Sequence, residues 1–96
     1  MLEDSARALL KAASGELSAL KALLAAGADV NSTDDEGDTA LHYACRANKL
    51  ENVKALLAAG ANPKATNESA RTPLSVAFEY HSAAVVEWME AEGLEN

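Results

Sequence analysis

The chain has 96 residues and a mass of 10.0 kDa, which is enough for one small domain. Apolar residues make up 49% and charged residues 24% of it, a balance typical of a globular domain and not of a disordered or fibrous chain. The formal net charge of −7 argues against nucleic acid and anionic membranes as partners, because both require a positive surface.

The sequence carries no signal for a membrane or for secretion. No apolar stretch approaches the ~18 residues of a membrane span, and the acidic residues 1–4 lack the basic region of a signal peptide. The single Cys45 cannot form an internal disulfide. We therefore expect a cytoplasmic protein.

One short segment, ALLAAGA, occurs at 22–28 and again at 55–61. The same offset of 33 relates Thr39 to Thr72 and Gly60 to Gly93. Agreement at one fixed spacing is the signature of a repeat protein in which each unit is a small group of elements. Each unit here is expected to contain two helices and an extended arm.

The first predicted helix contains the segment LLKAA at 9–13. At the offset of 33, Lys11 takes the position of Ala44 and Ala6 that of Thr39, so this helix lacks a threonine cap. Polar residues at apolar positions are expected in a terminal repeat, which has one face without a neighbour. The alternative is that this helix lies one residue out of register.

The link between the paired helices carries Gly15, Asn48 and His81 in the three units. These residue types tolerate a positive φ better than most. The shared ability predicts a left-handed turn at all three positions.

Residues 29–38 have no helical period and are rich in turn-forming side chains. We expect an extended arm that reverses near Gly37, with a counterpart at 62–71. Ala70 occupies the position of Gly37 in that counterpart. If the position requires a positive φ, Ala70 is strained by about 1 kcal/mol, or the second arm adopts another turn.

Helix boundaries in the second and third units are marked by caps. Thr39 and Thr72 are suitable N-caps, and Pro73 suits a first helical position, where its missing N–H costs nothing. The second helix of the central unit is expected at about 51–58. Three glycines should end the second helix of each unit in a left-handed conformation: Gly27, Gly60 and Gly93.

These segments resemble the ankyrin repeat, a 33-residue unit with the signature T-P-L-H-x-A. Residues 39–44 read TALHYA, 72–77 read TPLSVA, and 27–31 read GADVN. The resemblance covers essentially the whole chain and implies an all-α fold: an ankyrin-repeat solenoid of stacked antiparallel helix pairs with projecting β-hairpin-like fingers. It implies one domain, 1–96, with an N-terminal capping repeat at 1–30, a central repeat at 31–63 and a C-terminal capping repeat at 64–96.

The last unit departs from the repeat pattern as a terminal repeat should. Glu90 takes the position of Leu57, and Trp88 takes that of Ala55. We expect Trp88 to be buried against the last repeat. The alternative is that it is exposed and serves as a handle for self-association.

Residues with catalytic or metal-binding potential have simpler structural explanations. His42 and Cys45 are three apart on one predicted helix, but two His and one Cys are too few for a zinc site. The resemblance implies that His42 is a structural residue at its helix start and that Cys45 replaces a core alanine; His81 is expected to be a turn residue. The acidic run at 34–38 does not match the calcium-binding loop, because the first and last positions of such a loop would be Ser32 and Tyr43, and neither is acidic. We therefore expect no enzyme activity, no metal and no cofactor.

The resemblance implies a non-catalytic protein–protein interaction module that uses its finger tips and the concave face of its inner helices. Carried onto this sequence, the contact positions are Asp35, Glu36, Asp38, Tyr43, Arg46, Ala47, Glu68, Ser69, Arg71, Val76, Glu79 and Tyr80. The acidic first finger and the two tyrosines indicate a protein partner with a basic rim around an apolar centre. We expect the domain to be a monomer. The alternative is an engineered, stability-optimised scaffold or a self-assembling homo-oligomer with no natural ligand.

Overall fold

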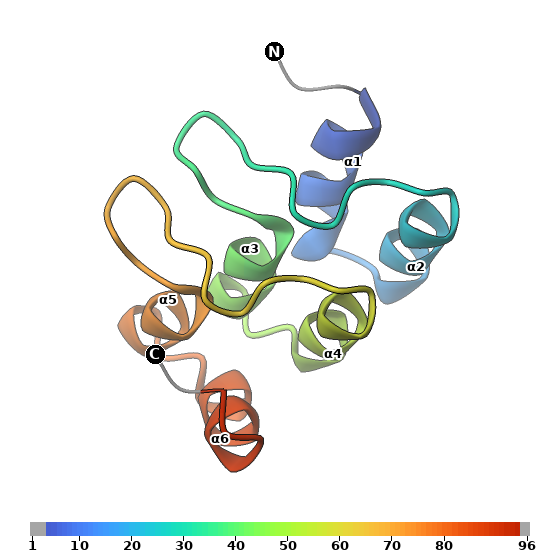
Figure 1. The fold of residues 1–96 in the computed structure, drawn as a ribbon. Helices are drawn as coiled ribbons and strands as arrows, with labels where there is room; N and C mark the ends of the chain where they lie inside the picture. The colour runs from blue at the N-terminus through green and yellow to red at the C-terminus, as the bar shows by residue number, and fades with distance from the viewer. Residues whose placement is uncertain (1–3, 95–96) are drawn as a thin grey trace.

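Three antiparallel helix pairs lie side by side in the computed structural model, which describes residues 4–94 (Figure 1). The helices are α1 (Asp4–Ala13), α2 (Leu17–Ala25), α3 (Ala40–Arg46), α4 (Leu50–Ala58), α5 (Pro73–Glu79) and α6 (Ala83–Ala91). The pair α1–α2 stands at one end and α5–α6 at the other, while the loops before α3 and α5 project to the same side as two fingers. None of the helices in this stretch is long and apolar enough to cross a membrane.

The helix boundaries predicted from the threonine caps, the proline and the glycines are confirmed. The Thr39 hydroxyl accepts the backbone N–H of His42 at 3.4 Å, and the Thr72 hydroxyl accepts that of Ser75 at 3.2 Å. Pro73 stands at the start of α5. Gly27, Gly60 and Gly93 have φ values of 94°, 96° and 75°. The helices α2, α4 and α6 therefore end in a left-handed turn, as predicted.

The links between paired helices differ at one end of the stack. Asn48 and His81 both have a φ of 56°, as predicted, whereas Gly15 does not have a positive φ. The prediction for Gly15 is wrong, although each of the three links, 14–16, 47–49 and 80–82, has three residues. Ala47, which precedes Asn48, has a φ of −85°, and Gly15 corresponds to this residue.

The different conformation of Gly15 follows from the register of α1. Leu9, Leu10 and Ala13 are buried in α1, and they match the buried Leu41, His42 and Cys45 of α3 at an offset of 32 instead of 33. The predicted pairings of Lys11 with Ala44 and of Ala6 with Thr39 are therefore wrong. The alternative register is confirmed, and Ala12 takes the position of Ala44.

One apolar core runs through all three repeats. Leu20 and Val53 are fully buried at equivalent positions of α2 and α4, and Leu56 and Met89 are fully buried at equivalent positions of α4 and α6. The cluster includes Cys45, whose sulfur lies 3.9 Å from that of Met89 in the next repeat. Each repeat alone could not bury these side chains, so the stack is the folding unit.

The C-terminal end of the core is closed by a half-buried tryptophan. Trp88 packs against the core cluster, and the ammonium group of Lys54 lies 5.6 Å from the centre of its ring. Trp88 therefore packs at the end of the core as predicted, but it is only partly buried. The alternative of an exposed handle beside Val85 is wrong, because Val85 is completely buried. Glu90 and Glu92 are exposed, as expected for an outer repeat.

The two fingers have the same internal hydrogen bonds. Asp34 N–H donates to the Asp38 carbonyl at 3.0 Å, and at the equivalent positions of the second finger Asn67 N–H donates to the Arg71 carbonyl at 3.1 Å. The reversal near Gly37 is confirmed, with a φ of 81°. Ala70 has a φ of 61°, so the second finger keeps the left-handed turn and Ala70 carries its strain.

This pair of turn residues gives two opposite expectations. Ala70→Gly should raise the free energy of unfolding by about 0.5–1 kcal/mol, because glycine relieves the strained φ. Gly37→Ala should lower it by about 1–3 kcal/mol, since an added Cβ would lie 3.2 Å from the Asn67 Cα and the Glu68 nitrogen. Urea unfolding of each variant measures both changes.

The control is Ala47→Gly, the same substitution at an exposed residue with a φ of −85°. It should destabilise, because glycine adds chain entropy and relieves no strain there. A loss of stability in Ala70→Gly as large as in Ala47→Gly would contradict the strain at Ala70.

Candidate partner-binding site

A hollow of about 130 Å³ lies between the two fingers and the inner helices α3 and α5. Its lining combines charged, amide, hydroxyl and aromatic groups: Glu36, Asp38, His42, Arg46, Asn67, Ser69, Arg71, Val76 and Tyr80. Seven of the twelve predicted contact residues are among them. The other five, Asp35, Tyr43, Ala47, Glu68 and Glu79, are not part of this lining. Val76 is only 6% exposed, so it forms an apolar floor and not a protruding contact.

The side chain of Arg46 is held between two aromatic rings. Its guanidinium carbon lies 4.9 Å from the centre of the Tyr43 ring and 5.7 Å from that of Tyr80. Tyr43 is one turn earlier on the same helix, whereas Tyr80 follows α5 in the next repeat. Cation–π contacts of this kind hold the guanidinium in place. The contact between Arg46 and Tyr80 forms only because two neighbouring repeats pack together.

Tyr43 is anchored in turn by the first finger. Its hydroxyl donates to the carboxylate of Asp34, and burial together with this bond raises the pKa of Tyr43 to about 12. Burial acts to raise the pKa of Asp34, but hydrogen bonds from Tyr43 and from the backbone of Asp38 and Glu36 lower it overall. Asp34 is therefore an ionised structural residue that ties the finger to α3.

Metal binding at the acidic run 34–38 finds no support in the geometry. The Asp34 carboxylate accepts the backbone N–H groups of Glu36 and Asp38, both at 2.9 Å, so it organises the turn. Within residues 4–94, no three His, Cys, Asp or Glu side chains are placed to hold a metal ion.

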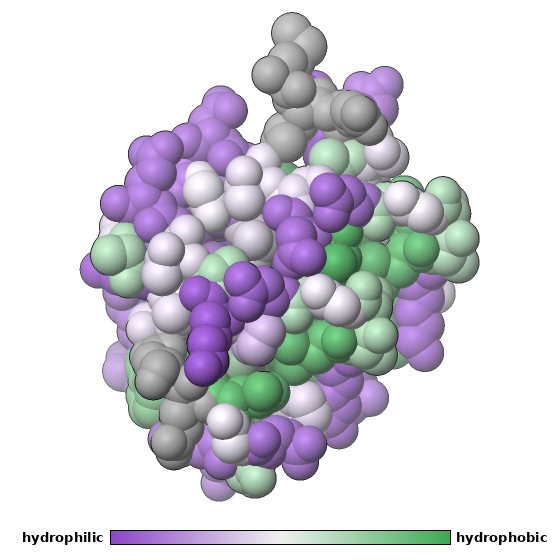
Figure 2. Space-filling view, viewed as in Figure 1, coloured by the Kyte–Doolittle hydropathy of each residue, from purple (hydrophilic) through white to green (hydrophobic). Residues whose placement is uncertain are grey.

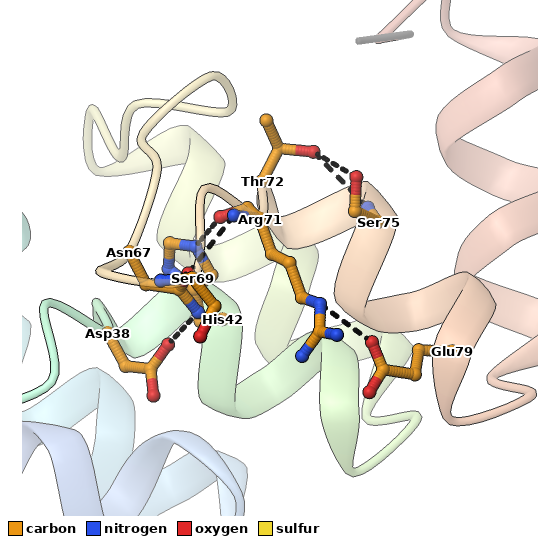
Figure 3. A network of polar contacts seen from close by, with 8 residues as sticks. All are labelled: Asp38, His42, Asn67, Ser69, Arg71, Thr72, Ser75 and Glu79. Carbon is orange, nitrogen blue, oxygen red and sulfur yellow. Dashed lines mark hydrogen bonds and ion pairs between the residues drawn. The ribbon is translucent and has the colours of Figure 1, made fainter.

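Asn67 joins the two fingers at the edge of the hollow (Figure 3). Its side-chain oxygen accepts the N–H groups of Ser69 and Arg71 at 2.9 and 3.0 Å, and its amide nitrogen donates to Asp38 at 2.8 Å. The backbone N–H of Glu68 also donates to the Glu36 carbonyl at 3.0 Å. Sequence reasoning missed Asn67, although its equivalence to Asp34 in the repeat was a usable signal.

His42 supports the hollow from below and is structural, as the resemblance implied. Its Nδ1 accepts the Thr39 N–H at 3.1 Å, and its Nε2 lies 2.9 Å from the Arg71 carbonyl, to which it donates. Both ring nitrogens are thus engaged, one with its own helix cap and one with the second finger. His81, with its φ of 56°, is the turn residue that was expected.

At the edge of the site one arginine forms an ion pair, whereas two acidic residues of the first finger form none with the described residues. The Nε of Arg71 lies 2.8 Å from a carboxylate oxygen of Glu79, the ion pair drawn in Figure 3. Glu36 and Asp38 have no ion pair within residues 4–94, where the ion pairs are Arg71–Glu79 and Lys54–Glu51. Figure 2 shows hydrophilic residues over the fingers, while hydrophobic residues gather over α2 and α4.

Cys45 does not form a catalytic pair with His42. Its side chain is fully buried in the core, and burial raises the pKa of the thiol to about 12. Because the thiolate is the reactive form, a thiol in this environment is inert.

Alkylation of Cys45 by iodoacetamide at pH 8 should therefore be at least about a hundredfold slower in the native protein than in the same chain unfolded in urea, since reaction requires opening of the core. Mass spectrometry over time measures both rates. A native rate close to the unfolded one would show that the thiol is accessible and would reopen the catalytic interpretation.

The chain matches a family model described as ankyrin repeats (3 copies), over residues 8–95. The match covers both fingers, all of α2 to α6 and α1 from residue 8 onward. A search of curated proteins gave no match. With three repeats of helix pair and finger along nearly its whole length, the chain belongs to the ankyrin-repeat family.

Proposed function

We propose that this domain binds a protein partner through its two finger tips and the inner face of α3 and α5, and that it is not a catalyst. Ankyrin repeats generally mediate protein–protein interaction and are typically non-catalytic. The observation that carries the proposal for this chain is the hollow at that face, which is lined by seven of the contact positions expected from the family.

Rigidity of this surface supports a binding role. The fingers are fixed to each other by the Asn67–Asp38 and Glu68–Glu36 hydrogen bonds and to the helices by His42 and Tyr43. A surface that is already ordered loses little conformational entropy when a partner docks.

The partner best suited to this face has a basic rim around an apolar centre. Asp35 and Glu36 are exposed at the first finger tip, and Tyr80, which is 52% exposed, supplies an amphipathic anchor beside the hollow. The net charge of −7 adds a long-range attraction for basic proteins.

The test is affinity capture followed by measurement of the dissociation constant for each captured protein. Tyr80→Ala should weaken binding by about 2 kcal/mol or more if the residue is an anchor. Asp35→Asn with Glu36→Gln should slow association and reduce its dependence on salt. The matched control is Glu87→Gln with Glu90→Gln on α6, which removes the same charge from exposed residues away from the hollow.

Equal losses in the finger and α6 variants, or an association rate that does not change between low and high salt, would contradict this site. Self-assembly is the competing function. Sedimentation equilibrium should give a monomer of 10.0 kDa, and a concentration-dependent oligomer abolished by Trp88→Ala would favour the scaffold alternative instead.

A further inference from the structure

We propose that the hollow between the fingers receives one basic side chain of the partner, with its cationic end on the carboxylates of Asp38 and Glu36. The inference rests on the proposed function and adds to it the chemistry of the residue that enters the site.

Asp38 is held in position to accept such a group. One of its carboxylate oxygens accepts the amide of Asn67 at 2.8 Å, and its backbone N–H donates to Asp34 at 2.9 Å. Its other carboxylate oxygen has no hydrogen-bond partner among the described residues. A carboxylate fixed in this way needs no reordering to bind a cation.

The charges around the hollow favour a cation over an anion. Arg71 is paired with Glu79, and Arg46 lies against two tyrosine rings with Asp34 as its acidic neighbour. Arg71 therefore has an ion-pair partner and the charge of Arg46 acts on Asp34, whereas Glu36 and Asp38 have no ion pair within residues 4–94. A partner carboxylate directed at Arg46 would meet these two acids.

Size and wall chemistry restrict the ligand to a single side chain. A volume of about 130 Å³ is too small for a helix or a folded segment. Val76 and the exposed ring of Tyr80 offer an apolar wall for an aliphatic stem, while the acids lie on the first finger. Long basic side chains bury the stem and direct the charge to polar groups in this manner.

The experiment uses three capped pentapeptides in which glycines flank a central lysine, norleucine or glutamate. Each is titrated into the ¹⁵N-labelled protein, and amide shifts of Asp38, Ser69 and Arg71 are followed. We expect saturable shifts with lysine and much weaker ones with the other two. Asp38→Asn should weaken lysine binding about fivefold, and so should Glu36→Gln. Glu87→Gln, the control at an exposed residue of α6 away from the hollow, should change it less than about twofold.

Equal binding of lysine and norleucine, preference for glutamate, the same loss in Asp38→Asn and Glu87→Gln, or no lysine-dependent shift at about 50 mM peptide would each overturn the proposal. Unfolding curves for each variant verify that it is folded. The peptides require no partner, so loss of the capture result with lysine binding intact would refute the proposed function alone, and the reverse outcome would refute this inference alone.

Discussion

Leu56→Ala should lower the free energy of unfolding by about 3 kcal/mol, within the range of roughly 2–5 kcal/mol for truncation of a buried leucine. Leu56 lies in α4 of the central repeat and is completely buried. It belongs to the core cluster shared by the three repeats, so the cavity would open where neighbouring repeats meet. A domain of this size has only about 5–15 kcal/mol of total stability, and the variant should lose a large fraction of it.

The matched control is Leu57→Ala, the same substitution at the next residue, which is half-buried. It should cost about 1 kcal/mol, because less apolar surface is lost and solvent already reaches the site. Urea unfolding monitored by circular dichroism gives both values. If the two variants lost the same stability, the shared core would not be the main source of cohesion between repeats.

Asn52→Ala should have the second largest effect, about 2–4 kcal/mol. Asn52 is 3% exposed, and its amide nitrogen donates to the carbonyls of Ala13 and Gly15 at 2.9 and 3.0 Å. These carbonyls belong to the first repeat, so one side chain of α4 joins two repeats. Removal of the donor leaves polar groups without a partner in a poorly hydrated place, which costs more than the bond itself contributes.

Asn31→Ala provides the comparison. Asn31 also joins two distant segments of the chain, with its amide donating to the Gly60 carbonyl at 3.3 Å and its side-chain oxygen accepting the Asn62 N–H at 2.9 Å, but both bonds are exposed. Water can replace them, so the expected loss is under about 1 kcal/mol. Hydrogen exchange in α1 should also accelerate in Asn52→Ala and not in Asn31→Ala; equal effects would mean that burial does not set the cost.

The third repeat solves the same junction with other residues, which supports the importance of the junction. Val85 is buried at the position equivalent to Asn52, and its N–H lies 3.3 Å from the side-chain oxygen of Asn48. Ser82 donates to the Arg46 carbonyl at 3.4 Å. The side-chain donor to the preceding repeat is therefore Asn52 in the second repeat and Ser82 in the third.

The sequence predicted part of the lining of the hollow and missed the rest for a physical reason. The repeat offset placed both finger tips and the inner helices, and seven of the expected positions line the hollow. Two lining residues, His42 and Asn67, were not predicted. Their polar side chains have local roles in a helix cap and in a turn, so no separate sequence signal indicated that they line the hollow. The stacking of Arg46 against Tyr80 could not be predicted, because it depends on how closely two repeats approach.

The sequence alone determined where helices begin and end, because these features depend on interactions between residues close together in the chain. Threonine caps, the proline at the start of α5 and the left-handed glycines act on backbone groups next to them, so these signals could be read without the rest of the molecule and are confirmed. The tertiary structure decided the register of α1, the partial burial of Trp88 and the meeting of the two fingers at Asn67. A shift of one residue turns a helix by about 100°, and only the packing of Leu9 and Leu10 into the shared core selects which face of α1 is buried.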